Sequence, residues 1–310
     1  MSSSPCTSLR RALTATATAA ALGAVLTACG SSGTGHDMAG MNHGAAASAT
    51  ASAEAPHSMP GMDHEMPGME GGNGLSDSQA GYRLTAQDAA VPAGTAADYR
   101  FAITGPDGKA VTDFAVDQTK QMHFYAIRSD LTGFQHLHPT MAPDGTWSAS
   151  LAALAPGTWR TYASFTPDSG DGKGTALVLS RTTTVAGAAT GTGTALPPAS
   201  VTAQADGYTV TVTGDLMANM AHGMTVGIAK DGKPVTDLQP YLDTYAHLTA
   251  FHEGDMAFAH LHPETTVNGD HGGPDLSFHA EFARSGNWRL FLQFRTAGQL
   301  HTAALTLKVG

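Results

Sequence analysis

The chain has 310 residues, of which 42% are hydrophobic, and this suits about two domains with apolar cores. Its formal net charge is −10 and only 14% of its residues are charged, so it lacks the basic surface that a nucleic-acid partner requires. The sequence contains no nucleophile elbow, phosphate-binding loop or pair of acid/base carboxylates at a telling spacing. We therefore expect a binding protein and not an enzyme.

Residues 1–28 predict a lipoprotein signal peptide. Arg10 and Arg11 precede a small apolar run, residues 12–28, that is too short and too rich in Ala and Thr to favour a membrane span. Residues 26–29 (Leu-Thr-Ala-Cys) resemble the bacterial lipobox, which implies that Cys29 becomes the lipidated first residue of the mature protein. An ordinary signal peptide or a spanning helix is the alternative. We expect an exported protein, lipid-anchored to the outer face of the cytoplasmic membrane.

The cysteine count limits the chemistry of any metal site. Removal of the signal peptide would remove Cys6 and leave Cys29 in the lipid anchor, so no free thiol would remain. A metal site must then use His, Met or carboxylate ligands, and a blue-copper centre, which needs a cysteine, is excluded.

Residues 29–79 predict a disordered tether, because Gly, Ala, Ser, Thr and Pro dominate and large aliphatic side chains are scarce. Six Met and four His nevertheless fall within 34 residues of it. They are His36, Met38, Met41, His43, His57, Met59, Met62, His64, Met66 and Met69. Thioether sulfur selects Cu(I) and imidazole suits copper in either oxidation state, and the tract resembles those of bacterial copper-resistance proteins. We expect metal capture; the alternative is a flexible linker with incidental Met.

The rest of the chain predicts two copies of one domain, residues 80–186 and 201–310, joined by a linker at 187–200. Strand-like segments alternate with turns every 8 to 12 residues or so, which is typical of an antiparallel sandwich. The first copy offers segments at 82–84, 99–104, 121–128, 134–138, 159–165 and 175–180. Residues 107–113 match 231–237, and 157–160 match 286–289, as a tandem duplication requires. The predicted fold is all-β, with two tandem Ig-like antiparallel β-sandwiches after a disordered tail.

One strand of each copy shows which side chains form the core. In the second copy Trp288, Leu290, Leu292 and Phe294 share a face, as do Trp159, Ala163 and Phe165 in the first. Because strand side chains alternate, we expect both sets to be core and not a cofactor site.

A three-histidine pattern is the strongest chemical signal, and it occurs once in each copy. His-Leu-His-Pro begins at His136 and again at His260, and a further histidine stands 13 residues before each first histidine. The candidate metal ligands are His123, His136 and His138 in the first copy, and His247, His260 and His262 in the second. The two histidines of each His-Leu-His point the same way on a strand, and we expect one site in each domain.

The preceding strand decides whether the third histidine joins them. A four-residue turn at 130–133 would set Ser129 beside Phe134 and bring His123 diagonal to His138, within reach across strands. An odd loop or a β-bulge would send His123 to the opposite face.

Three histidines with an open position suit copper or zinc, and affinity should fall as the pH drops through ~6.5, because the ligands must be neutral. Two alternatives stay open. One is that each His-Leu-His is a hydrogen-bonded corner closed by Pro. The other is a cupin-like site, although the first copy lacks the later histidine and the spaced glutamate of a cupin.

The second copy carries a further cluster of soft ligands. Met217, Met220, His222 and Met224 lie within eight residues where the first copy has only Val, Gly and Ala. They could hold Cu(I), or the Met side chains could fill gaps in the core. His252, His271, His279 and His301 are also confined to this copy, as possible further ligands or as surface residues.

Met-His, a short strand, Asp, and then Phe-x-His-Leu-His-Pro with Asp-Gly resemble secreted bacterial β-sandwich proteins of the YtkA-like kind. The resemblance covers residues ~80–310 in two copies by the repeat argument. It implies small Ig-like domains with a non-enzymatic role in copper handling at the cell surface. The residues to which the resemblance assigns this role are His123, His136, His138, His247, His260 and His262. The Met/His tether is an addition to the pattern.

Two functions therefore compete. The first is a surface lipoprotein that binds copper, with zinc possible, for sequestration or for transfer to a copper transporter or chaperone. The second is a tandem Ig-like interaction module that binds a protein or a cell-wall component, with histidines that are architectural. Metal content separates them.

Overall fold

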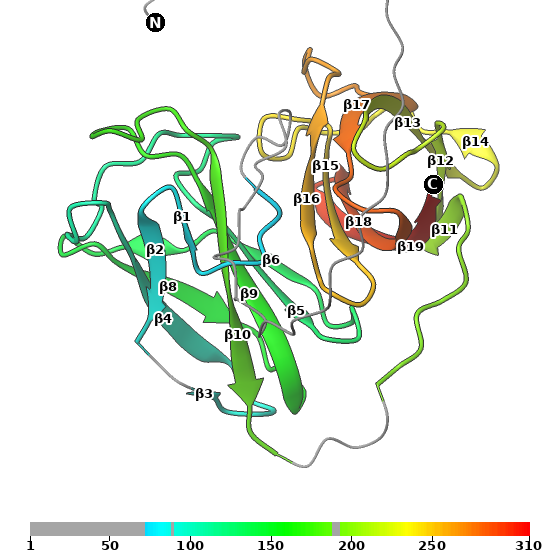
Figure 1. Ribbon diagram of the computed structural model, residues 1–310. Helices are drawn as coiled ribbons and strands as arrows, with labels where there is room; N and C mark the ends of the chain where they lie inside the picture. Colours follow the sequence, from blue (N-terminus) through cyan, green and yellow to red (C-terminus); the bar gives the residue numbers. More distant parts are fainter. Residues whose placement is uncertain (1–71, 88–89, 188–192) are drawn as a thin grey trace, which may run out of the picture. The chain divides into compact units, whose positions relative to one another are not determined.

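The computed structural model describes residues 72–87, 90–187 and 193–310, which form two tandem antiparallel β-sandwiches of the Ig-like kind (Figure 1). This confirms the predicted all-β fold class. The expected signal peptide, the lipidation site Cys29 and every Met and His proposed in the tether lie outside the described residues. Within the part of the chain that is described, no helix is long and apolar enough to cross a membrane.

The first sandwich contains two five-stranded sheets, in the strand orders β1-β2-β4-β8-β7 and β3-β10-β9-β5-β6. The bounds are β1 Ser78–Gln79, β2 Tyr82–Ala86, β3 Ala90–Val91, β4 Ala97–Thr104, β5 His123–Arg128, β6 Gln135–Leu137, β7 Thr140–Met141, β8 Thr146–Leu151, β9 Gly157–Phe165 and β10 Leu177–Val185. The last predicted strand, 175–180, is thus observed as a longer one that begins two residues later.

The second sandwich repeats this plan as one continuous path, β11-β12-β13-β17-β16-β15-β18-β19, with the short β14 beside β13. The bounds are β11 Thr202–Ala205, β12 Tyr208–Thr213, β13 Ala221–Lys230, β14 Lys233–Pro234, β15 Ala246–His252, β16 Phe258–Pro263, β17 Asp275–Glu281, β18 Gly286–Thr296 and β19 Gln299–Val309. In Figure 1 these strands run from yellow-green to dark red.

Alternation of apolar and polar side chains builds the two cores. On β4 the buried residues are Tyr99, Phe101 and Ile103, each separated by a more exposed neighbour, as a half-buried strand requires. The predicted core faces are confirmed, since Trp288, Leu290, Leu292 and Phe294 are all fully buried, and Trp159, Ala163 and Phe165 are buried in the other core. Burying each large side chain contributes on the order of 1.5–3 kcal/mol.

A third apolar cluster joins the outward faces of the two sandwiches. Tyr125 and Tyr162 of the first sandwich pack with Phe251, Phe258 and Phe291 of the second. The Tyr125 and Phe258 rings lie 5.2 Å apart, and those of Tyr162 and Phe251 lie 5.3 Å apart. We call this cluster the interdomain cluster. It shields one face of β5 from water, and the other face of β5 belongs to the core of the first sandwich.

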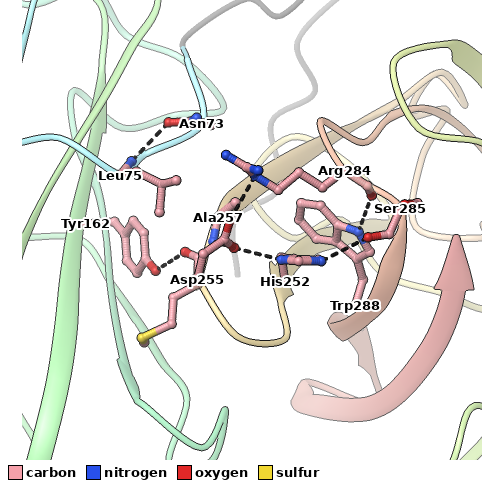
Figure 2. A network of polar contacts seen from close by, with 10 residues as sticks. Asn73, Leu75, Tyr162, His252, Asp255, Ala257, Arg284, Ser285 and Trp288 are labelled. Atoms are coloured by element: carbon pink, nitrogen blue, oxygen red, sulfur yellow. Dashed lines mark hydrogen bonds and ion pairs between the residues drawn. The ribbon is translucent and has the colours of Figure 1, made fainter. Parts of the chain in front are cut away.

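Polar contacts surround the interdomain cluster. The Tyr162 hydroxyl donates to the main-chain oxygen of Met256 at 2.6 Å, in the hairpin between β15 and β16 (Figure 2). Residues 73–76 bridge the two sandwiches, because the amide of Phe258 donates to Asn73 O and the amide of Ser180 donates to Ser76 O. The two sandwiches are therefore held by main-chain hydrogen bonds as well as by apolar packing.

Candidate metal centre

The His-Leu-His-Pro motif lies where the chain passes from one sheet of a sandwich to the other. In the first sandwich β6 pairs with β5 and β7 pairs with β8, so His138 and Pro139 stand between strands of opposite sheets. In the second sandwich the single strand β16 pairs with β15 through Leu261 and with β17 from His262 onward. The motif is thus a crossover at the edge of each sandwich.

The observed register differs from the predicted one by two residues but leaves the histidines on one face. Tyr125 pairs with His136 and Phe124 with Leu137, whereas the predicted turn would have set Ser129 beside Phe134. The loop is tighter than expected, because Leu131 and Gly133 adopt positive φ angles of 58° and 70°. Gly133 also lies against the Trp159 ring, where a Cβ would clash. A shift by two residues preserves the face, so His123, His136 and His138 remain neighbours.

The structure groups three imidazoles from both sandwiches. His123 on β5, His136 on β6 and His247 on β15 each present one ligand nitrogen, and these nitrogens all lie within 4.8 Å of one another. We call this group the histidine cluster. His123 Nδ1 lies 3.1 Å from His136 Nε2, and the His136 and His247 rings are 4.6 Å apart. The expectation of one separate site in each domain is therefore replaced by a group shared between the domains.

The spacing of the histidine cluster suits a small transition-metal ion. Nitrogens bound to a tetrahedral ion at 2.0–2.1 Å are about 3.3 Å apart, and the His123–His136 spacing already has this value. No pair of these nitrogens would have to approach by more than about 1.5 Å to reach this spacing.

Hydrogen bonds fix which nitrogen of each ring carries the proton. His123 Nε2 faces the main-chain oxygen of Asp117 at 3.1 Å, and this oxygen can only accept. His136 Nδ1 faces Gln293 Oε1 at 2.7 Å, and His247 Nδ1 faces Gln118 Oε1 at 2.7 Å. Each ring therefore donates outward. The inner nitrogens of His123 and His136 are then both acceptors, and neither can donate to the other.

This arrangement is the one found around metal-binding histidines, which donate their second N–H to a carbonyl or carboxylate oxygen. Two acceptor nitrogens 3.1 Å apart could share a bound cation or an added proton. Burial lowers the pKa of His123, with the positive charge of Lys120 acting in the same direction, so an added proton is disfavoured. An imidazole must be neutral to bind a metal ion, so this shift is compatible with a metal site.

The two glutamines exchange partners across the interface. His136 of the first sandwich is oriented by Gln293 of the second, and His247 of the second is oriented by Gln118 of the first. The Tyr125 hydroxyl lies 3.1 Å from His247 Nε2 and donates to it, and burial raises the Tyr125 pKa, so this group remains a neutral phenol. Neither sandwich contains the complete group without the other.

His138 lies beside the histidine cluster. Its ring is 4.7 Å from that of His136 and 5.2 Å from that of His123. Its Nε2 is buried and has no hydrogen-bond partner in the described part of the protein. Burial, with smaller effects of His123 and Lys120, lowers the His138 pKa to about 4. A neutral imidazole with an unpartnered nitrogen, next to three others, also supports a metal-binding site.

The other predicted residues of the second copy are placed differently. His260 pairs with Thr249 on the neighbouring strand, and its side chain lies outside the described part of the chain. His262 is exposed on β16, where it pairs with His279 of β17. Among the described side chains, no second group of three His, Cys, Asp or Glu residues accompanies the histidine cluster.

The residues of the Met-rich segment in the second copy differ in burial. Met224 is 1% exposed and packs in the core, which favours the gap-filling role that was the alternative expectation, and its role as a ligand stays a prediction. Met217 and Met220 are about half exposed, at 51% and 52%. His222 is partly buried on β13 and faces the same side as Met224.

Three residues of the site escaped the sequence analysis. Gln118, Gln293 and Tyr125 have no motif, and their positions follow only from the packing of one sandwich on the other. A signal for that packing does exist in β5, where His123 to Ile127 is buried throughout instead of alternating. A strand buried on both faces in a two-sheet sandwich requires a partner surface.

Fold and cluster together define a tandem Ig-like β-sandwich protein with a histidine group between its two domains. The chain belongs to the family described as Domain of unknown function (DUF8832), which matches residues 77–182 and again residues 203–310. No curated protein matches the chain.

Similar solved structures include a bacterial adhesin, the protein InvD and a macroglobulin. FdeC, an Escherichia coli adhesin, is 15% identical at a TM-score of 0.24, over 75% of this chain and 65% of that one. InvD of Yersinia pseudotuberculosis is 14% identical at a TM-score of 0.23, over 75% of this chain and 58% of that one. Alpha-2-macroglobulin from Escherichia coli is 12% identical at a TM-score of 0.24, over 77% of this chain and 16% of that one. The chain thus spans less than two thirds of each of these structures, and likeness at this level does not indicate a shared function.

Proposed function

We propose that this protein is an exported, non-enzymatic copper-binding protein that holds one ion in the histidine cluster, between its two sandwiches. The observation that carries the proposal is the hydrogen bonding of the three rings. Each imidazole donates one N–H to an oxygen outside the cluster, and one nitrogen of each ring lies within 4.8 Å of the other two. Ligands that are oriented in this way before the ion arrives bind it with little loss of side-chain freedom.

The donor set favours copper. Cu(II) binds nitrogen ligands more tightly than the other divalent first-row ions, and zinc accepts the same donors in a tetrahedral arrangement. No carboxylate belongs to the group, so oxygen-seeking ions such as Mg²⁺ and Ca²⁺ find no suitable ligand there.

The role we infer is sequestration of copper, or its transfer to a transporter or chaperone, outside the cytoplasmic membrane. The lipobox-like residues 26–29 would anchor the chain through Cys29, and the Met/His tract, His36 to Met69, would capture ions and pass them to the folded domains. The tract supplies soft thioethers for Cu(I), whereas the histidine cluster supplies only imidazoles.

An interaction module is the second candidate. The interdomain cluster and the exchanged glutamines fix the two sandwiches against each other, and the histidines would then be architectural contacts of that interface. In this case the loss of a histidine would lower stability in metal-free buffer without changing the metal content.

Metal content separates the two functions. The full chain is loaded with Cu(II), desalted and analysed for bound metal beside the variants His123→Gln, His136→Gln and His247→Gln. We expect each variant to lose one equivalent of copper, while His271→Gln, an exposed histidine beside Asp270, keeps it. Circular dichroism in metal-free buffer checks that the variants fold. Folded variants that keep the full metal content would support the interaction module.

A further inference from the structure

Two further histidines face each other on the surface of the second sandwich. His262 of β16 and His279 of β17 are direct partners in the antiparallel register, and both are exposed. Directly opposed residues of an antiparallel pair project to the same side, with Cβ atoms about 4.5–5.5 Å apart. Two imidazoles at this distance can bind one transition-metal ion from solution.

A small cavity is lined by one residue of this surface pair and by one residue of the histidine cluster. Its volume is about 40 Å³, and its lining includes both the exposed His262 and the buried His123. His123 is 2% exposed, and its ring belongs to the cluster. A metal ion that reaches the cluster from solution must pass buried side chains, and this cavity offers it one exposed and one buried imidazole.

Charged groups line the same cavity. Asp117 and Lys120 both belong to it, and their main chains are joined by reciprocal hydrogen bonds of 2.8 Å. The positive charge of Lys120 opposes the approach of a cation, and the carboxylate of Asp117 favours it. The electrostatic influence of Lys120 already reaches the cluster, since it contributes to the lowered pKa values of His123 and His138.

We propose that His262 and His279 form an uptake pair that binds a divalent transition-metal ion at the surface and delivers it through this cavity to the histidine cluster. The inference rests on the proposed function, because it needs the cluster as the destination. Two ligands hold an ion less tightly than three or four, so the uptake pair releases it readily. A first site that binds weakly and a second that binds tightly give directed transfer.

The uptake pair is tested by itself in a chain whose cluster is disabled by His123→Gln, His136→Gln and His247→Gln. Substoichiometric Cu(II) is added, and the imidazole proton resonances are followed by NMR, with His262 and His279 assigned by substitution. We expect these two resonances to broaden together, and His279→Ala to abolish the early broadening of His262. Resonances of His262 and His279 that broaden no earlier than that of His271 would overturn the pair as a binding site.

Delivery is tested by the rates of metal loading and release in the full chain with its cluster intact. Stopped-flow fluorescence with Cu(II) should show loading about tenfold slower in His279→Ala, the scale on which the loss of a supporting residue acts at metal sites. Release to a chelator should slow by the same factor, because a relay accelerates both directions equally. Lys120→Gln should load faster, and His271→Ala should match the parent chain.

The outcomes distinguish the two levels of inference. Unchanged loading in His279→Ala, while the cluster still binds copper, would overturn the uptake pair and leave the proposed function standing. If the cluster variants retain the full metal content, the proposed function fails, and the NMR experiment still decides whether the pair binds. Faster release without slower loading would make His279 an ordinary ligand and would also overturn the relay.

Discussion

Gln293 Oε1 lies 2.7 Å from His136 Nδ1, and the two residues belong to different sandwiches. The reciprocal contact, Gln118 Oε1 to His247 Nδ1, has the same length. Each domain thus supplies the oxygen that orients a histidine of the other. Binding of an ion by the histidine cluster and docking of the two sandwiches are then linked, because an ion that binds only the docked form stabilises that form.

The first prediction concerns these glutamines. Gln293→Leu removes the acceptor of His136 and keeps a similar volume, so the ring loses its fixed tautomer while the interface stays filled. We expect Cu(II) affinity to fall about 10- to 100-fold, as is usual when a metal-bound histidine loses the hydrogen-bond acceptor of its other ring nitrogen. A chelator competition titration measures it. Gln299→Leu, at the exposed start of β19, is the matched control, and equal affinities in both variants would contradict the assignment.

The second prediction concerns thermal stability. At free copper a hundredfold above Kd, the folded form gains about 2.7 kcal/mol, which corresponds to a rise of about 5–10 °C in Tm for domains of this total size. Calorimetry with and without Cu(II) should show this rise. His247→Gln should abolish it, since that ring is the contribution of the second sandwich to the cluster. A rise that persists in His247→Gln would place the stabilising ion elsewhere.

Much of the fold follows from the sequence because strand alternation is a local property. Trp288, Leu290, Leu292 and Phe294 fall on one face at every second position, and they are core in the structure. The tandem repeat then makes the first copy a guide to the second. The same period of two placed His123 on the face of His136, although the predicted register was displaced by two residues.

The composition of the site depends on how the two sandwiches pack against each other, which the sequence patterns do not encode. The outward face of β5 could have met solvent, a partner protein or the other sandwich, and alternation alone does not choose. Packing of Tyr125 against Phe258 brings His247 to His123, with their rings 5.5 Å apart, from 124 positions away in the chain. The expectation of one site per domain treated each copy as complete, whereas the structure brings imidazoles of both copies together.

The third prediction concerns Tyr125. Its hydroxyl donates to His247 Nε2 at 3.1 Å, so an ion must displace this hydrogen bond before that nitrogen can bind it. Tyr125→Phe should therefore raise Cu(II) affinity by about 2- to 10-fold, the equivalent of a net hydrogen bond of about 0.5–1.5 kcal/mol. The same chelator competition measures it. Weaker binding in Tyr125→Phe would mean that the hydroxyl is itself a ligand.

The fourth prediction concerns pH and the metal-free protein. Burial lowers the pKa of His138 from 6.5 to about 4 and also lowers that of His123, so the unfolded chain takes up these protons before the folded one does. Stability should be retained above about pH 6.5 and should fall between pH 6.5 and 4. The loss attributable to His138 should be on the order of 1–2 kcal/mol, after allowance for its partial solvent contact.

Denaturant midpoints at several pH values measure this loss, and His138→Asn should flatten the curve in that window whereas His271→Asn should not. Asp130, whose pKa is lowered by its hydrogen bonds to Arg128 and Thr132, titrates below the window and does not interfere. Stability that increases on acidification would show that the folded protein favours the charged imidazole.

The fifth prediction separates the Met/His tract from the folded domains. The tract offers six thioethers and four imidazoles between His36 and Met69, enough for about two or three Cu(I) ions at three to four ligands each. Deletion of residues 36–69 should remove these equivalents in a Cu(I) titration under reducing conditions and should leave the copper of the histidine cluster in place. The His136→Gln variant should show the converse loss, and the two losses should add, because the ligand sets share no residue. If the deletion also removed the copper bound through His123, His136 and His247, the tract and the cluster would be a single site.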